Sequence, residues 1–431
     1  MPAILNDPKF ALDRSLSPEQ LLLLLHVAEL AATLQMPLYL VGGFVRDLLL
    51  GQAATDFDLV VEGDAIALAR ALAAQYGGRV TAHSRFGTAQ WFLPDSSGHA
   101  LDFISTRSET YEHPGALPTV KSGLLADDLA RRDFTINTLA LRLDGDHWGE
   151  LRDDWAGLED LEKGLVRVLH PQSFIDDPTR LFRLVRYEQR YGFRIAPQTL
   201  DLIPPARPLI GSLSAERLRH ELDLILEEEQ AVAMLGRLSE LELLQPAHPA
   251  LAWNDTTRER FINGLRLARE TSIKSIPASA GGSFLGWHFW LVDHASKDIQ
   301  GIEQRLHFHA NLLASLLAAS ALLTDLPSLA GSAELKPSQC VASLEGLPLT
   351  AVYAVFLSIP DGTARRNLQS YMQIWRHIKP KASGYDLIER GLPVGPRYQQ
   401  ILERLRQAWL DGEVTTEREE IKLLDSLTDL D

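Results

Sequence analysis

Two aspartates, Asp56 and Asp58, stand two residues apart in a run of otherwise apolar, strand-forming residues, DFDLVVEG. Residues two apart on a strand project from the same face, so the two carboxylates are expected to lie side by side. Carboxylates at that distance repel each other unless a cation compensates, and Mg²⁺ prefers such hard oxygen ligands. The spacing therefore predicts a site that holds two Mg²⁺ ions for phosphoryl chemistry.

A pair of glycines precedes this run in the segment LVGGFVRDLLLG. Gly42 and Gly43 end an apparent strand at a point where the backbone must bend or approach a ligand closely. The helix expected over 44–50 would aim its first N–H groups at an anion, and Arg46 lies in its first turn. Either fragment alone would indicate a tight turn or solvated aspartates. Together, in this order, they favour a phosphate cradle beside a metal-binding carboxylate pair.

The two segments together resemble the signature of the nucleotidyltransferase superfamily, specifically the class II family of tRNA CCA-adding enzymes and bacterial poly(A) polymerases. This resemblance implies that Asp56 and Asp58 are catalytic metal ligands. It also implies that four residues of the first segment bind the nucleotide: Gly42, Gly43, Arg46 and Asp47. The superfamily usually has a third catalytic carboxylate on a later strand. Asp102 in ALDFIS is the candidate, because its apolar neighbours face the other way, although a plain strand-end aspartate would give the same pattern.

A second block, DDLARRDFTINTLALRL (127–143), resembles the family motif RRDFTxNA. The resemblance implies that Arg132 and Asp133 serve the nucleotide, with Asn137 in support. An arginine forks onto a triphosphate, and a carboxylate beside it either holds the ribose or orients the arginine. An isolated RRD would instead indicate an ion pair at the start of a helix.

Four arginines follow at helical spacing in FIDDPTRLFRLVRYEQRYGF (174–193). Asp177 suits the N-cap, Pro178 the first turn and Gly192 the end of a helix of about fourteen residues. At about 100° per residue, one stripe of this helix carries Arg180, Arg183, Arg186 and Arg190. Such a stripe is usually a solvated face, but here Glu188 alone interrupts the positive charge.

The family's corresponding motif is EDxxR, and this chain has Asp176 in place of the glutamate. The resemblance implies that Asp177 and Arg180 recognise the incoming base, while Arg183 and Arg186 orient that pair and face phosphates. A carboxylate accepts from the exocyclic amine that cytosine and adenine carry and uracil lacks. Two side chains would thus select C and A without a nucleic-acid template.

The composition is that of an ordinary globular protein: 431 residues, 45% hydrophobic and 23% charged, which is long enough for more than one domain. The net charge of −15 argues against wholesale binding of a polyanion, so contact with nucleic acid is expected to be local. The single cysteine, Cys340, favours a cytoplasmic protein with no disulfide-linked partner. The leucine run 21–25 indicates an amphipathic helix, so no membrane association is expected.

Strand and helix signals divide the chain. Short β-type runs mix with helical ones from Leu38 to about Leu143, and almost every later pattern is helical. We expect an α+β fold: a nucleotidyltransferase-type α/β head with a small mixed sheet (1–150), followed by an all-helical neck (151–230) and a helical body and tail (231–431). The resemblance implies that the head is catalytic, that the neck recognises the base, and that the body and tail bind tRNA. In the neck, Arg217 and Glu221 at i and i+4 are expected to form a scaffold ion pair.

These features predict an enzyme that adds CCA to the 3′ end of tRNA from CTP and ATP and releases pyrophosphate. Three alternatives within the family stay open: addition of CC alone, addition of A alone, and poly(A) synthesis. Segment 107–127 occupies the place of the family's flexible loop, which CC-adding members are expected to lack, and it favours CCA or A addition. A non-catalytic RNA-binding protein on the same fold is the remaining alternative, and the retained Asp56 and Asp58 speak against it.

Overall fold

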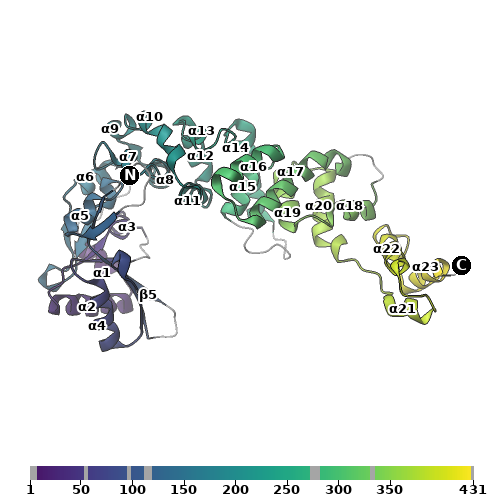
Figure 1. Cartoon of the computed structure of the whole chain (residues 1–431), viewed down its shortest axis with the longest axis horizontal. Coiled ribbons are helices and arrows are strands. Elements are labelled where there is room, and N and C mark those ends of the chain that lie inside the picture. Colours follow the sequence, from purple (N-terminus) through teal and green to yellow (C-terminus); the bar gives the residue numbers. More distant parts are fainter. Residues whose placement is uncertain are drawn as a thin grey trace. The chain divides into compact units, whose positions relative to one another are not determined.

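The computed structural model describes residues 7–52, 57–94, 99–110, 119–271, 282–330 and 335–428. Two compact units make up the chain: one comprises Met1–Glu221 and Arg237–Ala247, and the other Leu222–Gly236 and His248–Asp431. Strands of the described residues end by Ile195, in the purple to teal part of the ribbon in Figure 1, and helices make up the green and yellow part. The predicted α+β fold class is confirmed, and the finer division at residues 150 and 230 stays a prediction.

A seven-stranded mixed sheet forms the centre of the first unit. Its order is β3-β4-β5-β2-β1-β8-β9, with β2 parallel to β5 and the other neighbours antiparallel. The strands are β1 (Leu38–Val41), β2 (Asp58–Val61), β3 (Arg79–His83), β4 (Thr88–Phe92), β5 (Ala100–Ser105), β8 (Ala140–Arg142) and β9 (Glu150–Arg152). The sequence pattern does not predict the edge strands β3 and β9, because their residues are mostly exposed and lack an apolar run.

Local signals explain the helices around this sheet. Helix α2 (Pro18–Thr33) contains the leucine run and starts at a capping box. Helix α4 (Ala65–Tyr76) starts at Asp64, whose carboxylate accepts from two N–H groups of the first turn, and ends at Gly77 with φ 84°. The other helices of this unit are α1 (Pro8–Ser15), α3 (Gly43–Leu49), α5 (Leu125–Ala130), α6 (Gly157–Lys163), α7 (Ser173–Asp176), α8 (Arg180–Tyr191), α9 (Pro197–Leu200), α10 (Ile203–Ala206) and α13 (Leu244–Ala247).

A two-stranded hairpin is separate from the main sheet. Strand β6 (Arg107–Thr110) pairs antiparallel with β7 (Thr119–Ser122). At its base, the Thr106 hydroxyl donates to Gly123 O at 2.6 Å, and Gly123 N donates to Thr106 O at 3.1 Å. The hairpin thus forms most of the described part of segment 107–127, predicted to be the family's loop, and helix α5 begins near the end of that segment. Residues 111–118 lie outside the described part of the chain.

The second unit is built from helices. Its helices are α14 (Asp255–Glu270), α15 (Ser283–Leu291), α16 (Ser296–Leu306), α17 (Ala310–Ala330), α18 (Pro337–Leu344), α19 (Leu349–Ser358), α20 (Thr363–Gln373), α21 (Gly384–Glu389), α22 (Pro396–Leu410) and α23 (Glu417–Thr428), and the division between the two units falls within α11 (Ala215–Leu226) and α12 (Ala231–Glu240). Helix α17 is long and apolar enough to cross a membrane, but core helices have the same properties, and α17 packs against α15, α16, α19 and α20.

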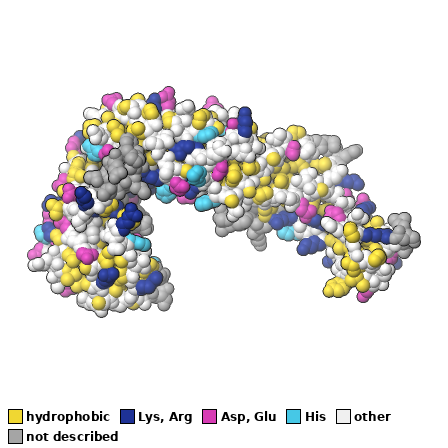
Figure 2. Space-filling model, in the orientation of Figure 1, with side chains coloured by type: hydrophobic (Ala, Val, Ile, Leu, Met, Phe, Trp, Pro, Cys, Tyr) yellow, Lys and Arg dark blue, Asp and Glu magenta, His cyan; other side chains and the backbone are white. Residues whose placement is uncertain are grey.

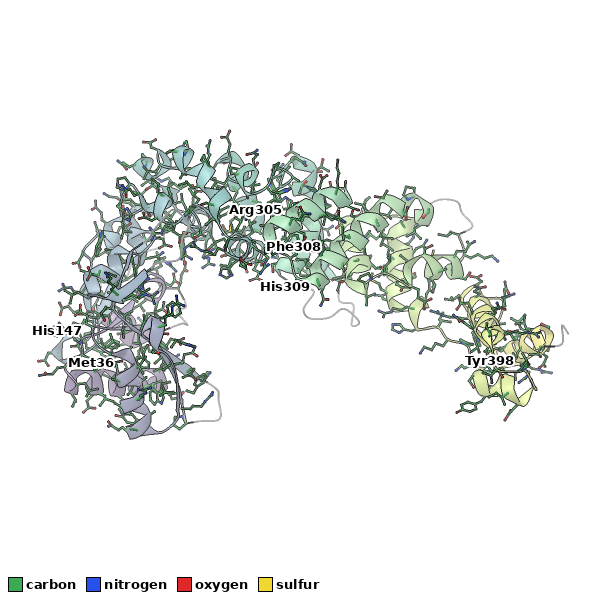
Figure 3. The ribbon with its side chains drawn as sticks, in the orientation of Figure 1. Met36, His147, Arg305, Phe308, His309 and Tyr398 are labelled. Atoms are coloured by element: carbon green, nitrogen blue, oxygen red, sulfur yellow. The ribbon has the colours of Figure 1, made fainter. Side chains whose placement is uncertain are left out.

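The last three helices have a small core of their own, centred on Leu387, Ile401, Leu405 and Leu424. Tyr398 of α22, labelled in Figure 3, donates its hydroxyl to Leu392 O at 2.7 Å and so holds the chain that precedes this helix. On the face drawn in Figure 2, acidic and basic side chains are intermixed. That pattern agrees with the expectation of local rather than wholesale contact with nucleic acid.

Candidate active site

Gly42 forms the turn between strand β1 and helix α3. Its φ of 68° and ψ of −125° lie in a region that favours glycine, and its N–H donates to Leu139 O at 3.0 Å. A Cβ at this position would collide with Nη1 of Arg132. The predicted glycine turn is therefore confirmed, and its reason is the guanidinium that crosses it. Helix α3 starts at Gly43, one residue earlier than predicted.

Two of the three predicted carboxylates lie on neighbouring parallel strands. Asp58 of β2 is paired with Asp102 of β5, and since paired residues project from the same face, their carboxylates share one side of the sheet. Asp56 lies outside the described residues. Within the described residues, no three His, Cys, Asp or Glu side chains converge as a metal-ligand set. A set that includes Asp56 therefore stays a prediction.

Arg46 is buried beneath the glycine turn, with 3% of its surface exposed. Its guanidinium donates to both carboxylate oxygens of Asp47 at 2.8 and 2.9 Å, and to Oδ1 of Asn137 at 2.5 Å. It lies over the rings of Tyr187 and Tyr191, 5.1 and 4.7 Å from their centroids, and the Tyr191 hydroxyl donates to Asp47 at 2.9 Å. Burial opposes the charge of Arg46, but Asp47 and the tyrosines outweigh it and raise the pKa of Arg46. Asp47 thus holds Arg46 in place.

Asp133 connects the RRD block to helix α8. Its Oδ2 accepts from Arg183 at 2.7 Å, and its Oδ1 accepts from Asn137 at 2.8 Å. Burial opposes its charge, but Arg183 and Asn137 outweigh burial and lower the pKa of Asp133 to about 2. The structure pairs Asp133 with Arg183 rather than with Arg132, the residue it was expected to orient.

We expect Asp133→Asn to lower the free energy of unfolding by about 2–3 kcal/mol at pH 7, from a shift of nearly two pKa units at about 1.4 kcal/mol each. The folded pKa lies below the ordinary value of 3.8, so this stability is complete above about pH 5 and is lost as the pH falls toward 2. Urea unfolding of wild type and variant at pH 7 and near pH 3 measures this contribution to the free energy of unfolding. Asp201→Asn, an exposed residue outside the site, is the control. If the difference in unfolding free energy between wild type and Asp133→Asn were the same at both pH values, the lowered pKa of Asp133 would be contradicted.

Asp128 lies beneath the two arginines of the RRD block and is fully buried. Its Oδ1 accepts from Arg131 at 2.7 and 3.0 Å, and its Oδ2 accepts from Arg132 at 3.3 Å. Arg132 also donates from Nη1 to Asn137 O at 3.3 Å, and its Nε is buried with no hydrogen-bond partner in the described part of the chain. An unsatisfied buried donor costs about 1–3 kcal/mol. The contacts with Asp128 and Asn137 hold the Arg132 side chain in place.

The start of helix α8 differs from the prediction. The helix begins at Arg180, without Asp177 as its N-cap, and ends at Gly192 as predicted. Oδ1 of Asp177 instead accepts from N and Oγ1 of Thr179 at 3.0 and 2.7 Å, and from Arg217 at 2.8 Å. Such an Asx turn bonds two residues ahead and does not cap the helix. Because Oδ1 takes all three donors, Oδ2 has no hydrogen-bond partner among the described residues.

Two buried arginines of α8 have different surroundings. Arg180 donates to Ser173 Oγ at 2.6 Å and to Arg131 O at 2.7 Å, so the first residue of α8 is fixed against the RRD block. Arg186 pairs with Glu221 at 3.2 Å and is not part of the pocket lining. It was predicted to face phosphates, but in this position it supports α8. Arg217 and Glu221 were expected to pair with each other, but Arg217 holds Asp177 of the pocket and Glu221 holds Arg186 outside it.

These groups converge on a pocket of about 460 Å³. It is lined by Gly43, Arg46, Asp58, Ile104, Arg131, Arg132, Asp133, Asn137, Asp177, Arg180, Arg183 and Tyr187. Five arginines against three aspartates make the lining positive, which suits a nucleoside triphosphate.

The sequence predictions did not include Asp128, Arg131 or Tyr187. Helical spacing is the signal for them, because Asp128 stands three residues before Arg131 and Tyr187 stands four after Arg183.

Two family models match the chain. Residues 38–167 match the Poly A polymerase head domain, and residues 192–254 match the probable RNA and SrmB-binding site of polymerase A. An A-adding tRNA nucleotidyltransferase from Halalkalibacterium halodurans is 34% identical over 91% of this chain and 88% of its own length. The chain belongs to the tRNA nucleotidyltransferase family. The resemblance seen in the motifs is confirmed, and the chain is an enzyme of this family.

Other proteins of the tRNA nucleotidyltransferase family are also similar to this chain, in sequence or in structure. An A-adding enzyme from Geobacter sulfurreducens is 36% identical over 97% of this chain, which spans 48% of that relative's length. A CCA-adding enzyme in an apo form superposes with a TM-score of 0.83, at 29% identity over 98% of this chain and 99% of the other. The Thermotoga maritima CCA-adding enzyme in complex with tRNA gives 0.79 at 28% identity, with the same coverage. CCA-adding enzyme complexes with ATP and CTP give 0.80 and 0.81 at 29% and 28% identity, over at least 98% of each chain.

Proposed function

We propose that this chain adds the terminal adenylate to the 3′ end of tRNA, transferring AMP from ATP and releasing pyrophosphate. The observation that carries nucleotidyl transfer is the arginine-rich pocket with Asp58 in its wall. The choice of adenylate is supported by the names of two relatives, both A-adding enzymes, that align over more than nine-tenths of the chain. Complete CCA addition from CTP and ATP, the function predicted from the sequence, is the second candidate, because the similar solved structures are CCA-adding enzymes.

The lining of the pocket supports separate roles for its side chains. Arg132 and Arg46, both in the pocket lining, would hold the triphosphate, and Gly43 would let a phosphate approach the backbone closely. Oδ2 of Asp177 would accept from the exocyclic amine of adenine or cytosine, while Arg180 would donate to ring acceptors. Uracil carries a carbonyl where those bases carry the amine, so two acceptors would face each other and uracil would be rejected.

Asp58 and Asp102, with Asp56 proposed beside them, would hold Mg²⁺. The fit rests on the donor set, because carboxylate oxygens on neighbouring strands are the ligands that Mg²⁺ prefers. Two such ions, when bound, lower the pKa of the attacking 3′-hydroxyl and balance the charge on the phosphates. The arginines hold the triphosphate in place for the incoming hydroxyl, and the ion pairs with Asp128 and Asp133 keep Arg132 and Arg183 in position.

We expect Gly42→Ala to raise the KM for ATP by about tenfold or more, the loss of one charged contact at about 1.5–3 kcal/mol. The added Cβ collides with the Arg132 guanidinium and forces it away from the pocket. Steady-state kinetics on a tRNA that ends in CC measure the effect. Gly51→Ala is the matched control, since Gly51 also has a positive φ, 66°, but nothing lies within 4 Å of its Cβ position. Equal losses in both variants would show that backbone strain, and not Arg132, is responsible.

The proposed function is tested with labelled ATP and CTP, given singly and together to tRNA transcripts that end at the discriminator base, at C and at CC. We expect one AMP on the CC-ending transcript and no CMP on any transcript. Addition of CCA to the first transcript would support the second candidate, and long adenylate tails would indicate poly(A) synthesis. No incorporation on any transcript would contradict all three.

A further inference from the structure

A second pocket, of about 360 Å³, lies at the base of the β6–β7 hairpin. Its lining includes Gly63 after β2, Ser105 at the end of β5, and residues of the hairpin and of the turn Ser84–Phe86. It shares no lining residue with the active-site pocket. Because β2 and β5 run parallel from Asp58 and Asp102 toward this pocket, it lies at the far ends of the strands that carry those carboxylates.

Three cations line this pocket, in a chain whose net charge is −15. The side chains of Arg85 and Lys121 form no hydrogen bond or ion pair with any residue that the structure describes, and Arg107 donates to Phe86 O at 3.4 Å. The acid in the lining, Asp64, already accepts from two N–H groups at the start of α4, at 2.9 and 3.0 Å. Three cations against one carboxylate give the lining a net positive charge, which attracts an anion.

An aromatic ring stands beside these cations. Phe86 is 47% exposed, and the Arg85 guanidinium lies 5.5 Å from its ring centroid. An exposed ring next to basic side chains binds a nucleotide by stacking on its base while the cations hold its phosphate. Hydroxyl groups of Ser84 and Ser122 line the same pocket and add hydrogen-bonding capacity for phosphate oxygens.

We propose that this second pocket binds one nucleotide through its phosphate group, with Arg85 and Lys121 on the phosphate and the base against Phe86. The nucleotide is either free in solution or one unit of an RNA strand. The two sources present the same chemistry to the pocket. The inference does not rest on the proposed reaction, because it uses no residue of the active-site pocket.

Lys121 itself provides the test. Its rate of acylation by an N-hydroxysuccinimide acetate is measured by mass spectrometry on the full chain, with exposed Lys9 as the internal reference. The probes are AMP, adenosine and a tRNA transcript that ends in CC. We expect saturation of two thirds of the sites, at twice the dissociation constant of AMP or of the tRNA, to slow acylation of Lys121 by up to about threefold and to leave Lys9 unchanged. Protection by AMP identifies a free nucleotide, and protection by tRNA alone identifies an RNA unit. No protection by either, or equal protection by adenosine, overturns the proposal.

A pair of variants excludes protection that originates in the active site. We expect Arg85→Gln to lose the protection of Lys121, because the phosphate loses one of its two cations. Arg70→Gln, at an exposed position of α4, removes the same charge elsewhere and is expected to keep the protection. Protection that persists in Arg85→Gln overturns the proposal. If the wild-type enzyme incorporated no nucleotide into any transcript, the proposed reaction would be contradicted, but the protection of Lys121 from acylation would still test the second pocket.

Discussion

Asp58→Ala is expected to reduce nucleotide incorporation into tRNA to about one-thousandth of the wild-type rate or less, the scale of loss seen when a residue essential to the chemistry is removed. Asp58 lines the active-site pocket, and the substitution removes a carboxylate that is proposed to hold Mg²⁺. Single-turnover incorporation of AMP measures the chemical step without product release. Asp146→Ala, an exposed aspartate outside both pockets, is the control for loss of one negative charge. A rate above one-tenth of wild type would contradict the metal role.

A metal-rescue experiment separates ligation from folding. Asp58→Cys replaces the hard carboxylate with a soft thiolate, which favours softer divalent ions over Mg²⁺. We expect Mn²⁺ or Cd²⁺ to restore part of its activity and to give no benefit to Asp58→Ala. Asp102→Ala belongs in the same series, because Asp102 is paired with Asp58 across β2 and β5. Wild-type activity in Asp102→Ala would make Asp102 a plain strand-end aspartate.

Asp177→Asn is expected to change which base is accepted. The side chain keeps its shape, and Oδ1 still accepts from Thr179 and Arg217, but an amide donor replaces the unpaired Oδ2. A donor at that place suits the carbonyl of uracil and opposes the amine of adenine and cytosine. One such hydrogen-bond reversal is worth about 1–3 kcal/mol. We therefore expect the ratio of kcat/KM for ATP over UTP to fall by about 10–100-fold.

Incorporation of AMP and UMP into a tRNA that ends in CC measures this ratio. The neighbouring Asp176→Asn is the matched control, since the Asp176 carboxylate lies 3.7 Å from His170 Nε2 and is not part of the pocket lining. An equal loss for ATP and UTP in Asp177→Asn would show that Asp177 only holds the start of α8. An unchanged ratio with full activity would remove Asp177 from base recognition.

The sequence by itself determined the features that depend on local periodicity. The two-residue period of a strand places Asp58 on the exposed side of an apolar strand, and the glycine pair predicts the turn at Gly42. The period of a helix puts Arg180 and Arg183 on the face that lines the pocket. Each of these signals lies within a few residues of chain, so backbone geometry alone is enough to read it.

Only the tertiary structure decided which of these side chains meet. Asp133 pairs with Arg183, 50 residues away, and the Tyr191 hydroxyl reaches Asp47, 144 residues away. From its local setting Asp177 is predicted to be the N-cap of helix α8. In the structure its Oδ1 accepts from Arg217, 40 residues away, and the helix begins at Arg180. Ion pairs between distant segments depend on strand register and on the packing of helices against the sheet. Local propensities of the sequence do not predict that packing, because the two partners of each ion pair come together only when the chain has folded.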